Sequence, residues 1–189
     1  MAPSLAAVPV SSERAGRAGL SLVVVSLVGG TVAVAVGVYG RVHTPTGGNM
    51  FRLGFSSLRE TKSWLATGAV VLAVGQVASA LAMWGRLPGL RRTPRCMPFL
   101  HRWTGTAAFV LSLPVAYHCL WALGLRTTDA RVLVHGLLGC AFYGAIATKL
   151  LALRSRLLPG WAIPVIGSTL VCVLTGVWLT SALWFFTAA

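Results

Sequence analysis

Residues 18–40 read AGLSLVVVSLVGGTVAVAVGVYG, a run without a single charged side chain. An α-helix rises about 1.5 Å per residue, so about 20 apolar residues cross the hydrocarbon core of a bilayer, which is about 30 Å thick. The run is also longer than the 7–15 apolar residues of a cleaved signal peptide. It therefore predicts a transmembrane helix that stays in the protein.

Four more stretches of this kind follow, at 64–85, 101–124, 131–153 and 161–186. The whole chain is 56% hydrophobic and 10% charged, whereas about a quarter of the residues of a soluble domain are charged. We therefore predict an all-α fold, an integral membrane bundle of five transmembrane helices that occupies residues 18–189. Residues 1–17, rich in Ala, Ser and Pro, are expected to form a disordered cytoplasmic tail.

The net charge of +13 comes from basic residues that lie almost entirely in short connectors and at the ends of the spans. No connector is long enough to form a nucleic-acid-binding module, so no nucleic-acid partner is predicted. Basic residues near span ends set the orientation of a membrane protein. Their modest excess on one side predicts an N-in/C-out topology in the plasma membrane, with the lipid bilayer as the main partner.

Ionisable residues inside a span are costly and indicate function. The three acidic residues, Glu13, Glu60 and Asp129, fall in the tail or in loops, which argues against a proton-coupled transporter. Two histidines lie deep in spans. His118 precedes the expected outer end of the third helix by six residues, and His135 follows the expected start of the fourth by five, so their depths are about 9 Å and about 7.5 Å.

These histidines sit on helices that are joined by about six residues, so the two helices should be antiparallel neighbours. Two imidazoles at matched depth on facing helices are what a bis-histidine haem b requires. Gly139, one turn from His135, would leave room for a flat macrocycle, and Arg126 and Arg131 would pair with the haem propionates. We predict His118 and His135 as the iron ligands.

The alternative interpretation is that each histidine only forms a hydrogen bond between helices, as polar residues in membrane bundles do. Both interpretations stay open. Copper is a weaker alternative, because no HxM or CxxxC spacing accompanies the cysteines.

Three further residues are lower-ranked candidates. His101 and Lys149 lie towards the inner ends of the third and fourth spans, where snorkelling explains them, and no histidine on the fourth span completes a second haem site there. His43 follows the first span in a loop, where it would be solvated or act as an alternative ligand.

Several segments resemble an actinobacterial family of multi-pass membrane proteins of unknown function: GRVHTPTG (40–47), LHRWTG (100–105), LPVAYHCLWALG (113–124), RVLVHGLLGCAFYGAIATK (131–149) and WLTSALWFF (178–186). The resemblance covers most of the chain beyond the tail. More loosely, the histidine-bearing hairpin resembles the cytochrome b and ferric reductase-like group, which implies haem b and electron transfer. The histidine pair 13 or 14 residues apart that two stacked haems need and the flavin or nicotinamide domain are missing.

The leading hypothesis is thus a small b-type cytochrome-like electron-transfer protein, an oxidoreductase component with one haem near the outer face. Its partner would be a quinone or an extracytoplasmic redox protein. No residue pattern indicates a hydrolase or transferase. The second hypothesis is a haem-free scaffold or assembly subunit of a larger membrane complex, and a transporter is the third.

Overall fold

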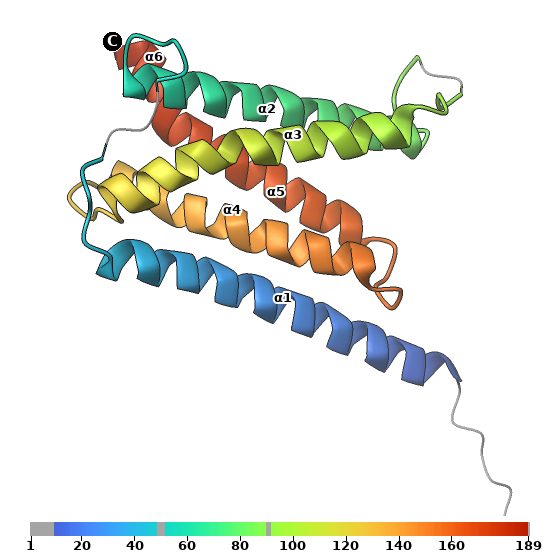
Figure 1. Cartoon of the computed structure of the whole chain (residues 1–189). Coiled ribbons are helices and arrows are strands. Elements are labelled where there is room, and N and C mark those ends of the chain that lie inside the picture. Colours follow the sequence, from blue (N-terminus) through green and yellow to red (C-terminus); the bar gives the residue numbers. More distant parts are fainter. Residues whose placement is uncertain (1–9, 49–51, 90–91, 189) are drawn as a thin grey trace, which may run out of the picture.

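The computed structural model describes residues 10–48, 52–89 and 92–188. Its helices are α1 (Val10–Val42), α2 (Leu58–Met83), α3 (Met97–Tyr117), α4 (Ala130–Arg154), α5 (Ala162–Trp178) and α6 (Trp184–Ala188). Two π-helical segments, η1 (His118–Leu123) and η2 (Leu179–Leu183), continue α3 and α5 without a break. The described part of the chain therefore forms five long rods (Figure 1).

Each rod is long and apolar enough to cross a membrane. The spans are Glu13–Val42, Leu58–Met83, Met97–Leu123, Ala130–Arg154 and Ala162–Thr187. The prediction of an all-helical protein with five membrane-spanning helices is confirmed at this level for the described residues. Their large apolar side chains face outward, as expected where lipid rather than water is the solvent.

The N-terminal boundary differs from the prediction. Helix α1 begins at Val10, so residues 10–17 continue the helix instead of belonging to a disordered tail, while residues 1–9 lie outside the described part. The segment after Pro9 contains no further proline, and Glu13 lies in the first turn, where a carboxylate stabilises the positive end of the helix dipole.

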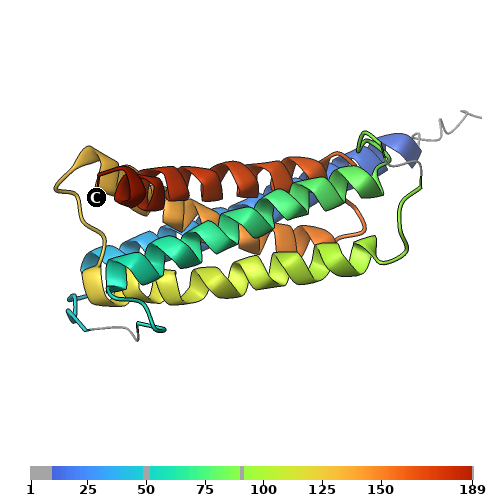
Figure 2. The ribbon, with the colours of Figure 1, turned by 90° about the horizontal axis from the view of Figure 1, so that it is seen from above.

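The rods pack as a bundle with α1 at its edge. Helix α3 packs mainly on α2, α4 packs on α1 and α5, and α2 also meets α5 (Figures 1 and 2). Helix α1 starts at one end of the bundle, and α6, the start of α2 and the α3–α4 connection all lie at the other end (Figure 1). We call this second end the loop end.

Apolar side chains from four helices meet in the middle of the bundle. Ala69 and Ala73 of α2 form a buried cluster with Phe142 of α4 and Leu174 of α5, and Leu111 of α3 packs against it. The small alanines let α2 approach its neighbours closely, which is the usual means of association between helices in lipid.

The short connection predicts that α3 and α4 are antiparallel neighbours. They are antiparallel, but α3 packs on α2 while α4 packs on α1 and α5, so the prediction that their backbones pack on each other is wrong. A side chain joins them instead. Tyr143 of α4 reaches α3, where its hydroxyl group lies 3.0 Å from Ser112 Oγ and donates to the Ser112 carbonyl oxygen at 3.1 Å. Its ring also meets the edge of Phe109. The two helices that carry the candidate ligands thus face each other across side chains, not backbone.

Removing this link should loosen the α3–α4 pair. Tyr143→Phe keeps the ring and deletes the hydroxyl group, so we expect a loss of about 0.6–1.7 kcal/mol, the range of interhelical hydrogen bonds in lipid. Thermal unfolding of the detergent-purified protein measures it. Thr169→Val is the matched control, because the Thr169 hydroxyl group bonds only within its own helix. Equal stability of both variants and the parent would contradict the assigned link.

Candidate functional site

Polar residues form a layer two helical turns from the apolar cluster, towards the loop end. A polar residue lies seven positions from each of four residues in or next to the apolar cluster, in the direction of the loop end. The pairs are Ala69 with Lys62, Leu111 with His118, Phe142 with His135, and Leu174 with Ser181. Seven residues make almost two full turns, so each residue stays on nearly the same helix face, displaced by about 10 Å. By this count both predicted ligands lie at a similar height in the bundle, His135 on α4 and His118 where α3 passes into η1, and we call this level the polar layer.

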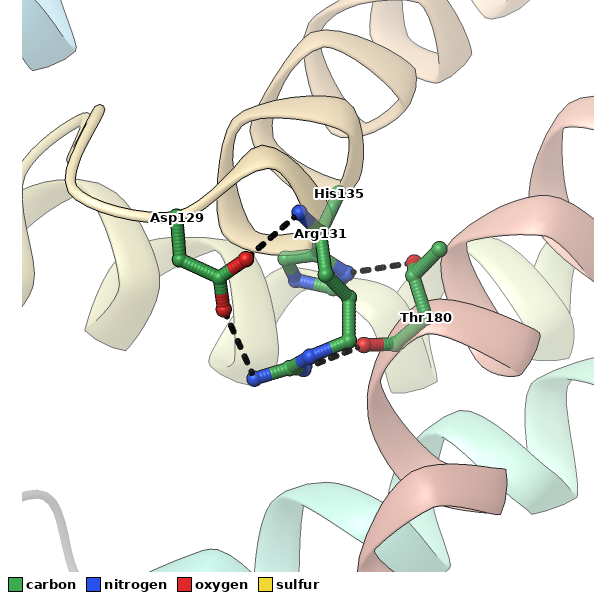
Figure 3. A network of polar contacts seen from close by, with 4 residues as sticks. All are labelled: Asp129, Arg131, His135 and Thr180. Atoms are coloured by element: carbon green, nitrogen blue, oxygen red, sulfur yellow. Dashed lines mark hydrogen bonds and ion pairs between the residues drawn. The ribbon is translucent and has the colours of Figure 1, made fainter.

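His135 is held by the end of α5 (Figure 3). Its Nδ1 lies 3.2 Å from the Val177 carbonyl oxygen and 3.2 Å from Thr180 Oγ1. A carbonyl oxygen only accepts hydrogen bonds, so Nδ1 must carry the proton. In the neutral ring Nε2 then has a lone pair, and a hydrogen bond of this kind fixes the tautomer and orientation of ligating histidines in metalloproteins.

Arg131, one turn before His135 on α4, also contacts the end of α5 (Figure 3). Its Nη1 donates to the Thr180 carbonyl oxygen at 2.7 Å, and its Nη2 lies 3.7 Å from Asp129 Oδ2. The guanidinium carbon also sits 4.3 Å from the centre of the Trp184 ring. Asp129 in turn caps α4 by accepting from the Arg131 backbone N–H at 2.9 Å. Arg131 thus joins the start of α4 to the end of α5 and stands beside His135.

His118 lies at the point where α3 changes its winding. Pro114 inside α3 has no N–H to donate and its ring crowds the preceding turn, which loosens the helix there. The π-helical segment η1 starts at His118 and ends at Gly124, whose φ of 67° favours glycine. His118 is 5% exposed, and its ring forms no hydrogen bond with the described residues.

The last span also changes to π-helical winding, near the end that carries η2. Segment η2 contains Thr180 and Ser181, whose hydroxyl groups donate to the Val177 carbonyl oxygen at 3.1 and 2.7 Å. Single π-helical turns are uncommon and frequently occur at functional sites. Here one carries His118 and the other carries the residue that orients His135.

Lys62 is a site residue that the sequence analysis missed. It was expected in a loop, but it lies half-buried in the second turn of α2, at the level of the polar layer. The sequence signal was present: Ser57 and Glu60 form the S-x-x-E pattern of a capping box. Ser57 Oγ indeed accepts from the Glu60 backbone N–H at 3.1 Å, so α2 begins before Lys62.

Gly139 and Arg126 were also predicted to contribute to the haem site. Gly139 has no atom within 4 Å of the position that a Cβ would take, so the space beside it is open. Arg126 is exposed and lines a cavity together with His43 and Arg41 at the loop end, apart from the contacts that Arg131 makes with α5. Within the described ranges, no three His, Cys, Asp or Glu residues form a cluster that could hold a metal ion.

The other three candidates lie elsewhere. His101 is at the opposite end of the bundle, with Nδ1 2.8 Å from Ser79 Oγ, and Lys149 is half-buried near it. The carbonyl oxygen of His101 also accepts from the side chain of Gln76. His43 is not a solvated loop residue, because its ring stacks on Tyr39 with a centroid distance of 5.0 Å and meets the tilted ring of Trp121 at 4.6 Å.

Comparison with protein families finds one match, a family of unknown function, DUF6529, over residues 22–189. The match begins within α1 and runs through the final residue, so it includes every residue of the polar layer. No curated protein and no solved structure matches the chain.

Proposed function

The chain belongs to the family of unknown function DUF6529, and from the chemistry of its polar layer we propose that it is a small b-type cytochrome-like electron-transfer protein. One haem b is held between α3 and α4 by His118 and His135. When bound, haem supplies reversible one-electron chemistry. The proposed partner is a quinone or an extracytoplasmic redox protein, and the proposed setting is the plasma membrane with an N-in/C-out topology.

The state of His135 is the observation that carries this proposal. Its Nδ1–H donates to the Val177 carbonyl oxygen, which leaves the Nε2 lone pair for a ligand. His118, in the same layer on the opposing helix, is buried without a hydrogen bond from the described residues. The described residues therefore leave the ring nitrogens of His118 available to a ligand.

A donor set of two neutral imidazoles suits haem in particular. The porphyrin itself supplies four nitrogen ligands to the iron, so the protein needs only two more from opposite sides. No atom lies within 4 Å of the position that a Cβ at Gly139 would take, which leaves room there for a flat group. Arg131, which stands beside His135, and Lys62 of the same polar layer would hold the haem carboxylates.

An optical spectrum tests the proposal. The full chain, produced with ample haem supply and purified in detergent, should show a sharp α-band in the difference spectrum between dithionite-reduced and air-oxidised samples. A flat difference spectrum would contradict the proposal and leave His118 and His135 as helix-packing residues, the role that a haem-free scaffold or assembly subunit requires.

Thr180 should position the ligand without touching it. Thr180→Val removes one acceptor from His135 Nδ1 but keeps the size of the side chain, and Val177 O remains. Changes around a ligating histidine typically cost about 10–100-fold in affinity, so we expect a haem affinity about tenfold lower, together with a shifted midpoint potential. Haem titration and redox titration measure these two effects. Thr187→Val, four residues beyond the segment, is the control and should change neither value.

A further inference from the structure

A basic cavity opens at the loop end, outside the contacts of the histidine pair. Its volume is about 340 Å³, and it is lined by residues of the segments 40–45 and 123–128. These segments contain the ends of the first and third spans, at Val42 and Leu123, and the residues that follow them. The cavity therefore sits at the boundary of the membrane, at the level of lipid headgroups.

Backbone hydrogen bonds hold the two segments together. The N–H groups of Thr46 and Gly47 donate to the carbonyl oxygens of Trp121 and Ala122, both at 3.2 Å, and Leu125 N–H donates to Gly40 O at 2.6 Å. These acceptors are available because the π-helical segment ends there. The cavity is thus built by α1, its following loop and the end of η1.

The lining is positively charged. Arg41 and Arg126 line the cavity from its two sides, and both are exposed. Across the described ranges the one ion pair is Arg131 with Asp129, so neither cavity arginine is neutralised by a carboxylate. The hydroxyl groups of Thr127 and Thr128 add hydrogen-bonding groups to the same wall.

His43 gives an independent indication that a ligand belongs here. It lines the cavity, and its Nε2 is buried without a hydrogen-bond partner in the described part of the chain. Its ring is fixed by aromatic contacts with Tyr39 and Trp121. A buried nitrogen without a partner is unfavourable, and a phosphate oxygen bound in the cavity would accept a hydrogen bond from Nε2–H.

We propose that this cavity binds a phosphate group, which Arg41 and Arg126 hold from opposite sides. Planar guanidinium groups match phosphate oxygens with paired hydrogen bonds, and basic pockets at the ends of membrane helices bind lipid headgroups. The phosphate comes either from an anionic phospholipid or from a soluble phosphate compound. The site does not depend on haem.

Thermal unfolding of the full chain in detergent tests the site with two probes. One is inorganic phosphate at constant ionic strength, and the other is phosphatidylglycerol in mixed micelles, compared with phosphatidylcholine. Stabilisation by inorganic phosphate identifies a soluble source, and stabilisation by phosphatidylglycerol alone identifies a lipid source. Either result supports the proposal when it depends on the cavity arginines.

The double variant Arg41→Gln/Arg126→Gln tests whether the stabilisation by phosphate depends on the cavity arginines. Each arginine removed should weaken the apparent affinity about tenfold or more, as expected for hydrogen bonds to charged groups. Arg52→Gln/Arg59→Gln is the matched control, because it removes the same charge from exposed residues that do not line the cavity. An equal response in both double variants, or no response of the parent protein to either probe, overturns the proposal.

Discussion

The double variant His118→Ala/His135→Ala should fold and bind no haem, whereas the parent protein should carry one haem per chain. Both ligands are lost, and alanine supplies no replacement for an axial nitrogen. Folding should survive because the apolar cluster of Ala69, Phe142 and Leu174 lies two turns away. Haem content by the pyridine haemochrome assay, with size-exclusion chromatography as the check on folding, measures the result.

The other two histidines provide matched controls for this experiment. His101→Ala and His43→Ala remove imidazoles of the same size that contact Ser79 and the rings of Tyr39 and Trp121. Both variants should keep a full complement of haem. Haem that persists in the double variant, or that disappears equally in a control, would show that the assigned ligands are wrong.

Gly144→Ala should separate α1 from the rest of the bundle. A Cβ at this position would lie 2.5 Å from the Gly29 carbonyl oxygen and 2.8 Å from the Ala33 Cβ, so the two helices must move apart. Overpacking of this kind typically costs about 1–3 kcal/mol. The obstacle includes backbone, which cannot rotate away as a flexible side chain can. We expect a clearly lower midpoint of thermal unfolding in detergent.

Gly29 and Gly30 allow a comparison between adjacent positions on α1. Gly29 is buried and faces Thr148 and Gly144, while Gly30 is exposed with no atom within 4 Å of an added Cβ. Gly29→Ala should therefore destabilise like Gly144→Ala, and Gly30→Ala should be neutral or slightly stabilising, since alanine favours helix. Equal behaviour of the two variants would contradict the packing of α1 on α4.

The five spans were predictable because hydropathy depends only on local composition and the thickness of the bilayer. Glycines as points of close approach were also predictable in kind, and Gly29 with Gly144 is such a point. Which glycines do this was not predictable: Gly75 and Gly139 face open space. Sequence alone does not reveal which helix faces meet, since that depends on the packing of the whole bundle.

In the candidate site, too, some features could be predicted from the sequence and others could not. The matched depth of His118 and His135 followed from counting residues along two helices. The hydrogen bond from His135 to Val177 did not, because it joins residues 42 apart in sequence and depends on where η2 places a carbonyl oxygen. Arg131 was expected to pair with a haem propionate, which stays a prediction, and its contacts with Asp129, Thr180 and Trp184 could not be read from the sequence. Lys62 could have been placed on α2 from the capping box at Ser57 and Glu60.

The electron paramagnetic resonance spectrum of the oxidised, detergent-purified protein tests most directly whether two histidines share one iron. Coordination by His118 and His135 predicts a low-spin ferric signal, which changes to high-spin in His118→Ala as one axial ligand is lost. A high-spin signal in the parent protein, or no haem signal after production with ample haem, would contradict the proposed site.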